Sequence, residues 1–228
     1  GDAIAAVIAK DEIIAQKALK LIKVDYDILD AVFNTEDAIA EGAPIIHEDK
    51  PNNIIASSKI EIGDINEEFK NADYVFEGEY ETSIVQHCQL ECQNAYAYVD
   101  ENNRIVIVTS TQIPHIVRRI VGQALNIPIG RIRVIKPFVG GGFGNKQDVI
   151  IEPLTAAMTL AVNGRPVRLL LDREEVFAST RTRHAMKYKI RTAISKDGKL
   201  LAISMNNQVN NGAYASHGHS IAIDRKST

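Results

Sequence analysis

Residues 139–148 read VGGGFGNKQD and place four glycines within five positions, interrupted only by Phe143. Glycine loses more backbone freedom on folding than any other residue, so this concentration carries a cost in conformational entropy. Consecutive glycines also let several backbone N–H groups converge on one point with no side chains in the way. The run therefore fits an anionic or oxo-bearing ligand, and it fits equally a tight bend that crosses another backbone.

The glycine run matches neither of two common phosphate-binding motifs. A Walker A loop needs Gly-Lys followed by Ser or Thr, whereas here Asn145 precedes Lys146 and Gln147 follows it. In the dinucleotide-binding fingerprint a third glycine would stand where this sequence has Asn145 or Gln147. A ligand bound by this run would therefore be of another kind.

The segments around the run alternate irregularly between helix and strand patterns, which predicts an α+β (mixed α/β) fold. Hydrophobic periodicity and capping residues predict the elements. We expect helices over 35–42, 65–72, 114–125 and 152–162, and strands over 73–82, 94–99, 104–111, 132–135, 167–171, 186–194 and 199–210.

The first 52 residues are expected to form a separate domain. Residues 3–10 and 23–29 read as strands, and residues 11–22 read as a helix capped by Asp11, so together they predict a compact β-α-β unit. The stretch 43–53 is rich in Pro and Asn, which is typical of a loop. We therefore predict two domains, 1–52 and 53–228.

The composition narrows the function classes. The chain of 228 residues has a net charge of -3 and a pI near 6.1, which gives no reason to expect nucleic acid or an anionic membrane as a partner. It contains no signal peptide pattern and no long apolar run of the kind that spans a membrane. Its two cysteines, Cys88 and Cys92, fit a reducing cytoplasm. Both chain ends favour a piece of a longer protein or of a split subunit.

Three further groups of polar residues have side chains that could bind a ligand or a metal. Gln112 follows a predicted strand and precedes a predicted helix, a position where sites are often built, although a glutamine there is more often a solvated surface residue. The segment HCQLEC, 87–92, lacks a second pair of ligands for zinc, so packing is the preferred interpretation. His217 and His219 are likewise interpreted as loop residues and not as metal ligands.

Several ordered motifs together resemble one known family. They are STQ at 110–112, NIPIGRIRVIKPFVGGGFGNK at 126–146, GRPVRLLLDREE at 164–175 and RTRHAM at 181–186. In this order they resemble the molybdenum-binding subunit of the xanthine dehydrogenase and aldehyde oxidase family, over essentially the whole chain. The resemblance implies that 1–52 is the C-terminal part of an α/β hammerhead domain. It implies that 53–228 is the N-terminal part of the molybdopterin-binding domain.

The resemblance also implies a cofactor and the residues that contact it. The family binds a molybdenum–molybdopterin cofactor, whose metal no side chain of this chain is expected to ligate directly. Gln112 would contact an oxo ligand of the metal, and the backbone of the loop would approach the metal and pterin at Gly141, Gly142, Phe143 and Gly144. Gln147 stands where animal xanthine enzymes carry a substrate-binding glutamate, which puts purine specificity in doubt.

The implied activity is oxidative hydroxylation of an N-heterocycle such as a purine, or of an aldehyde, with water as the oxygen source. The family's catalytic glutamate and its main substrate segment lie beyond Thr228, so no catalytic base is assigned here, and residues 1–228 alone are expected to be inactive. Electrons would leave through iron–sulfur clusters and FAD on partner chains. The alternative is a structural or assembly fragment without bound cofactor.

Overall fold

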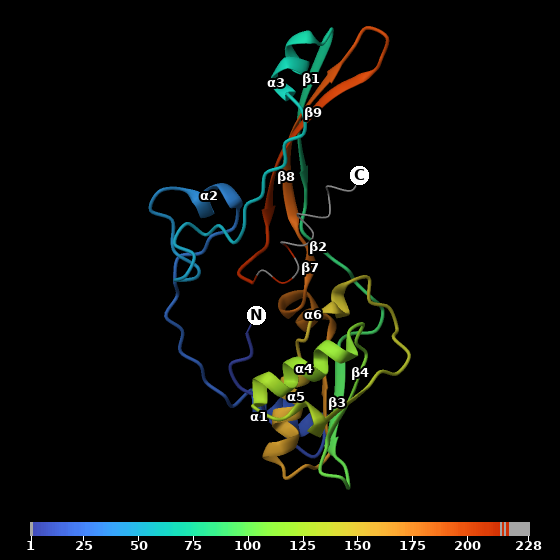
Figure 1. The fold of residues 1–228 in the computed structure, drawn as a ribbon. Helices are drawn as coiled ribbons and strands as arrows, with labels where there is room; N and C mark the ends of the chain where they lie inside the picture. The colour runs from blue at the N-terminus through green and yellow to red at the C-terminus, as the bar shows by residue number, and fades with distance from the viewer. Residues whose placement is uncertain (1, 215, 217, 219–228) are drawn as a thin grey trace. The chain divides into compact units, whose positions relative to one another are not determined.

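A computed structural model describes residues 2–214, 216 and 218, so His217 and His219 lie outside the described residues. The contacts divide the chain into two compact units (Figure 1). Unit 1 comprises Gly1–Tyr26 and Gln86–Thr182, and unit 2 comprises Asp27–Val85 and Arg183–Thr228. Each unit is therefore assembled from two separate stretches of the chain.

Unit 1 is built on a four-stranded sheet with the order β5-β4-β3-β6. Strand β3 (Asn94–Val99) pairs antiparallel with β4 (Ile105–Thr109) and β6 (Val167–Leu170), and β4 pairs parallel with β5 (Ile132–Ile135). The helices α4 (Pro114–Leu125) and α5 (Glu152–Ala161) pack on this sheet. Their contact with the strands buries a core of Ala97, Ile105, Ile107, Val117, Val121, Ile132 and Ala156.

The remaining elements of unit 1 are short. Helix α1 (Glu12–Leu19) begins where the Asp11 side chain accepts the N–H of Ile14, as its sequence predicts. Helix α6 (Arg173–Ser179) follows β6, and the single turns η1 (Ile129–Arg131) and η2 (Asn145–Gln147) flank β5 and the glycine run.

Unit 2 is an antiparallel three-stranded sheet with the order β1-β8-β9. It contains β1 (Tyr74–Thr82), β8 (Ala185–Ile194) and β9 (Leu200–Asn210). Helices α2 (Thr35–Ile39) and α3 (Ile65–Asn71) contact β9, and Asp64 caps α3 by accepting two backbone N–H groups. A separate two-stranded pairing joins β2 (Val85–Gln86) to β7 (Thr182–Arg183).

The mixed α/β fold class is confirmed, but the β-α-β unit predicted for the first 52 residues is wrong. Residues 2–9 and 22–33 form no strand, and only the helix between them is present. A strand needs a partner for its backbone groups, and alternation alone does not supply one. Ile28 and Leu29, which the pattern placed in or beside a strand, are 90% and 80% exposed.

The burial of helix α4 and the division of the chain into units both differ from what the sequence suggests. The apolar residues of the sequence 114–125 suggest a buried stripe that includes Ile116, Val117, Val121 and Ala124. Val117 and Val121 are buried, whereas Ile116 is 39% exposed and Ala124 is also exposed. The two units of the chain do not coincide with a boundary near residue 52. That boundary, as a division between domains, stays a prediction. No helix among residues 2–214 combines the length and apolar character that crossing a membrane requires.

Candidate functional site

Gln112 lies just beyond the end of a buried central strand. Strand β4 ends at Thr109, and the following Ser110 and Thr111 are buried as well. The backbone N–H of Gln112 donates to the carbonyl oxygen of Lys146 at 2.9 Å, which ties the strand end to the glycine-rich loop. The side-chain oxygen of Gln112 accepts the N–H of Gly144 at 3.2 Å. The predicted partners, Gln112 and the loop, are thus in direct contact.

The glycines of the loop answer two different physical demands. Gly141 and Gly144 have φ values of 95° and 91°, a region that side chains disfavour, and Phe143 lies there too with φ of 51°. Gly142 has no such angle, but a Cβ atom on it would lie 2.6 Å from Oε1 of Gln112. The loop therefore needs glycine at 141 and 144 for its turn and at 142 for space.

The turn leaves backbone donors without protein partners. Among the described residues, no acceptor receives the N–H groups of Gly141, Gly142 or Phe143. Phe143 itself is 74% exposed. The amide nitrogen of Gln112 also donates to no described residue. This set of donors fits an electron-rich, oxygen-bearing ligand.

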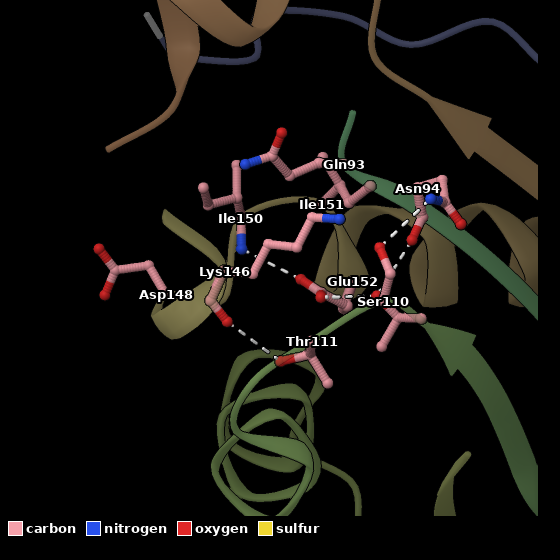
Figure 2. Close-up of a pocket in the computed structure, with 10 residues that line it drawn as sticks. Gln93, Asn94, Ser110, Thr111, Lys146, Asp148, Ile150, Ile151 and Glu152 are labelled. Atoms are coloured by element: carbon pink, nitrogen blue, oxygen red, sulfur yellow. Dashed lines mark hydrogen bonds between the residues drawn. The ribbon is translucent and has the colours of Figure 1, made fainter. Parts of the chain in front are cut away.

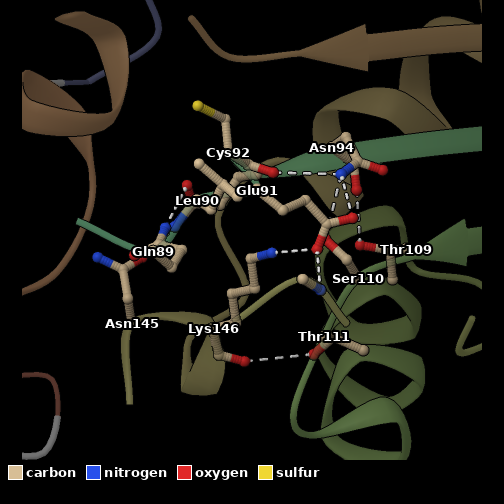
Figure 3. Close-up of polar contacts among 12 residues, drawn as sticks. Gln89, Leu90, Glu91, Cys92, Asn94, Thr109, Ser110, Thr111, Asn145 and Lys146 are labelled. Atoms are coloured by element: carbon tan, nitrogen blue, oxygen red, sulfur yellow. Dashed lines mark hydrogen bonds and ion pairs between the residues drawn. The ribbon is translucent and has the colours of Figure 1, made fainter. Parts of the chain in front are cut away.

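Glu91 contacts both ends of this loop, and Figure 3 shows its ion pair with Lys146. Its Oε2 atom accepts the N–H of Gly140 at 2.8 Å and the Lys146 ammonium at 2.5 Å. The Lys146 side chain is 1% exposed, and the Glu91 side chain is 31% exposed. Burial alone would raise the pKa of Glu91, but the hydrogen bonds from Lys146 and Gly140 outweigh it and lower the pKa.

Asn145, the residue before Lys146, anchors the loop through side-chain hydrogen bonds. The residue is fully buried, and its amide nitrogen donates to Oε1 of Gln86 and to the carbonyl oxygen of Arg181, both at 2.7 Å. Its side-chain oxygen accepts from Nε2 of Gln93, which is also buried. A residue with this many partners fixes the loop in place, because moving it would leave several buried polar groups unpaired.

A small polar pocket lies behind the loop, between the end of β4 and the start of α5 (Figure 2). Glu152 lines it and is 5% exposed, and its two oxygens accept hydrogen bonds from Thr109 and from the N–H of Ile150. Burial is the main cause that raises the pKa of Glu152. Because both oxygens already have protein partners, Glu152 has a structural role, and no catalytic role is assigned to it.

The structure places the other predicted residue, Gln147, at the end of the same turn. Gln147 is half-buried, and its N–H donates to the carbonyl oxygen of Gly144 at 3.3 Å. Nη1 of Arg181, in the RTRHAM motif, donates a hydrogen bond to the same carbonyl oxygen at 3.4 Å. The predicted site residues therefore belong to one continuous structure, Gln112 with the turn from Gly141 to Gln147.

Sequence reasoning missed the residues that hold the loop. In the sequence, Glu91 stands only within the segment HCQLEC, which lacks the ligand pairs of a zinc site, and Lys146 lacks the residues that surround the lysine of a Walker A loop. Helix α6 was missed as well, although Asp172 and Glu175 show the spacing of a capping box and form one. Arg173 of that helix donates to the carbonyl oxygens of Gln89 and Leu90, next to Glu91.

Comparison with known proteins gives one consistent result. The model of the family described as "Molybdopterin cofactor-binding domain" matches residues 46–225. A putative xanthine dehydrogenase molybdenum-binding subunit of Escherichia coli is 48% identical over 97% of this chain and 29% of that protein. The nicotinate dehydrogenase large molybdopterin subunit of Eubacterium barkeri is 35% identical over 97% of this chain and 51% of that protein. The chain thus spans well under two thirds of these relatives.

Solved structures of similar fold also belong to oxidoreductases. The aldehyde oxidoreductase of Desulfovibrio gigas superimposes with a TM-score of 0.83 and 27% identity, covering 88% of this chain and 22% of that one. The quinoline 2-oxidoreductase of Pseudomonas putida gives a TM-score of 0.80 and 30% identity, covering 87% of this chain and 25% of that one.

Proposed function

The chain belongs to the molybdopterin cofactor-binding domain family, and from this premise we propose that it supplies part of the molybdenum cofactor site of a hydroxylase related to xanthine dehydrogenase and aldehyde oxidase. The enzyme would oxidatively hydroxylate an N-heterocycle or an aldehyde with water as the oxygen source. The observation that carries the proposal is the set of loop N–H donors at Gly141, Gly142 and Phe143 that have no acceptor among the described residues, beside the Gln112 amide.

These residues suit the cofactor for a simple electrostatic reason. A molybdenum–molybdopterin group carries oxygen and sulfur ligands with negative charge, and backbone N–H groups stabilise such charge without a mobile side chain. Gly142 keeps a Cβ atom out of the space next to Gln112. We propose Gln112, Gly141, Gly142, Phe143 and Gly144 as the cofactor-binding residues.

When bound, the cofactor supplies the two-electron oxidation chemistry, and this chain supplies placement. The Gln112 side chain is oriented by its hydrogen bond from Gly144, so its NH₂ group is left to donate to a ligand. The exposed Phe143 ring would form an apolar wall that keeps water from one side. No carboxylate of this chain is assigned as the general base.

The substrate class is also a proposal. Relatives are named as acting on xanthine, nicotinate or aldehydes, all of which present an electron-poor carbon. Gln147 at the end of the turn would contact the substrate, and an amide cannot hold a proton as a carboxylate does. This favours recognition of a neutral edge of the substrate by hydrogen bonds.

Partner chains would complete the enzyme. The relatives are named as subunits, which supports further segments or chains that carry the rest of the molybdenum site, iron–sulfur clusters and FAD. The cytoplasmic location expected from the sequence stays a prediction.

The test is to purify the protein together with its natural partners and measure molybdenum and pterin per chain. Stoichiometric amounts of both are expected, together with reduction of a dye when a purine, nicotinate or an aldehyde is added. Absence of molybdenum and pterin from a well-folded complex would contradict the proposal. Presence of both without turnover of these compounds would contradict only the substrate class.

A further inference from the structure

A single carboxylate oxygen closes the glycine-rich loop into a ring of contacts. Oε2 of Glu91 accepts the N–H of Gly140 and the Lys146 ammonium, which are the two ends of the loop. The backbone N–H of Glu91 donates in return to the carbonyl oxygen of Gly140 at 3.1 Å. Glu91 and Gly140 are therefore joined twice, and a Cβ on Gly140 would lie 2.6 Å from the Cβ of Glu91.

The loop needs such a fastening because its middle makes few bonds of its own. Between Gly141 and Phe143 no N–H finds a protein acceptor among the described residues, and two of the three φ values are positive. A glycine-rich segment in this state has many alternative conformations. Donors can be preorganised for a ligand only if the ends of the segment are fixed.

Lys146 passes the same constraint to Gln112. Its side chain is held by Glu91, while its carbonyl oxygen accepts the N–H of Gln112 at 2.9 Å. The chain of contacts Glu91–Lys146–Gln112 thus links the ion pair to the residue proposed to contact the cofactor. Asn94 donates to the other oxygen of Glu91 at 3.3 Å and so limits its rotation.

We propose that Glu91 is a positioning residue, which fixes both ends of the loop 140–146 and thereby holds the donors of Gly141, Gly142 and Phe143 and the amide of Gln112 in the geometry that retains the cofactor. This inference rests on the proposed function. It assigns a role to Glu91 without placing it in contact with cofactor or substrate.

A simpler role is that Glu91 only neutralises a buried cation. Lys146 is almost fully buried, and an unpaired charge there would destabilise unit 1 whatever the loop does. The two roles differ in what happens when the cation is removed as well. If neutralisation is the whole role, removing both charges restores function. If positioning is the role, removing both charges restores stability, but the two ends of the loop are no longer held together.

The experiment compares three variants of the protein purified with its partners. Glu91→Gln removes the charge with little change of shape, and the double variant Glu91→Gln with Lys146→Met also removes the buried cation. The control is Asp100→Asn, which removes the charge from another ion pair of unit 1, with Arg104 at 3.0 Å, and from another carboxylate that accepts backbone N–H groups. Molybdenum per folded chain is followed during dialysis, alongside melting temperature and turnover.

We expect Glu91→Gln to lose molybdenum about tenfold faster than the wild type, the factor that corresponds to one hydrogen bond between charged groups. The double variant should regain melting temperature but not molybdenum retention, and Asp100→Asn should lower melting temperature without changing retention. Wild-type retention in Glu91→Gln, or its recovery in the double variant, would overturn the inference while leaving the proposed function intact. A wild type without molybdenum would refute the proposed function itself.

Discussion

Gly142 and its neighbours show that glycine is required for different physical reasons at nearby positions. Its neighbours at 141 and 144 have positive φ, so any side chain there would strain the backbone. At Gly142 the backbone is ordinary and the limit is the Gln112 side chain, with Cδ at 2.8 Å and Oε1 at 2.6 Å from a would-be Cβ. A substitution at 142 therefore acts on Gln112 before it acts on the fold.

Gly142→Ala should displace the Gln112 amide and weaken cofactor retention, with a stability loss of about 1 kcal/mol as in mild overpacking. Molybdenum content and thermal unfolding of the purified complex would check this. Gly130→Ala is the matched control, because a Cβ there has no atom within 4 Å and the φ angle is not positive. Equal molybdenum content in the two variants would show that the Gln112 side chain can move away from the new Cβ atom without weakening cofactor retention.

The depressed pKa of Glu91 makes the loop sensitive to acid. A carboxylate with a folded-state pKa below its unfolded value stabilises the protein above the unfolded pKa and loses that contribution as pH falls through the folded pKa. The free energy of unfolding of unit 1 should therefore decline below about pH 4.3, the ordinary value for glutamate. Titration of stability for wild type and Glu91→Gln measures this. If the free energies of unfolding of wild type and Glu91→Gln fell in parallel as the pH is lowered, Glu91 would contribute nothing to the acid sensitivity.

At the scale of elements, short helices position the site through their caps. Helix α6 begins with a reciprocal capping box between Asp172 and Glu175, at 2.8 Å in both directions. Its first residue, Arg173, reaches the carbonyl oxygens of Gln89 and Leu90, which precede Glu91. The cap thus supports the segment that carries the loop fastening.

Asp172→Ala should lower the free energy of unfolding by about 1 kcal/mol, the usual loss for an N-cap. Denaturant unfolding of the purified protein gives the number, and Glu174→Ala in the same first turn serves as control because Glu174 is exposed and does not cap the helix. The cap would be unimportant if both variants unfolded at the same denaturant concentration.

At the scale of the whole molecule, large apolar side chains remain exposed close to the loop. Leu90 is 92% exposed and Phe138 is 103% exposed, and Phe143 adds a third exposed ring. Exposed apolar groups in this number around a proposed site favour coverage by other protein surface. The Escherichia coli relative, of which this chain covers only 29%, contains further sequence that would provide such a surface.

A polypeptide of residues 1–228 produced without further segments or partners should self-associate and hold no stoichiometric molybdenum. The exposed apolar groups drive association, and a cofactor contacted only by Gln112 and the loop is open to water on its other side. Light scattering and metal analysis test the two parts. A monodisperse monomer with one molybdenum per chain would contradict both.

The sequence by itself determined many of the local elements and the identity of the loop. The helix α4 has the predicted bounds, Pro114–Leu125, since Pro114 at its start and an apolar stripe are local signals. The ordered motifs around the glycine run identified the family, which the comparisons confirm. In each case the information lies within a short stretch of residues.

Tertiary structure alone decided which local patterns became elements and what holds the loop. The alternating residues 23–29 form no strand, because pairing depends on a neighbour that the pattern does not reveal. Glu91 and Lys146 lie 55 positions apart in the chain, so no spacing rule connects them. Their ion pair exists because the fold brings the segment before β3 next to the turn after β5. In this place the Glu91 carboxylate contacts both ends of the loop, and the burial of Lys146 strengthens their electrostatic attraction.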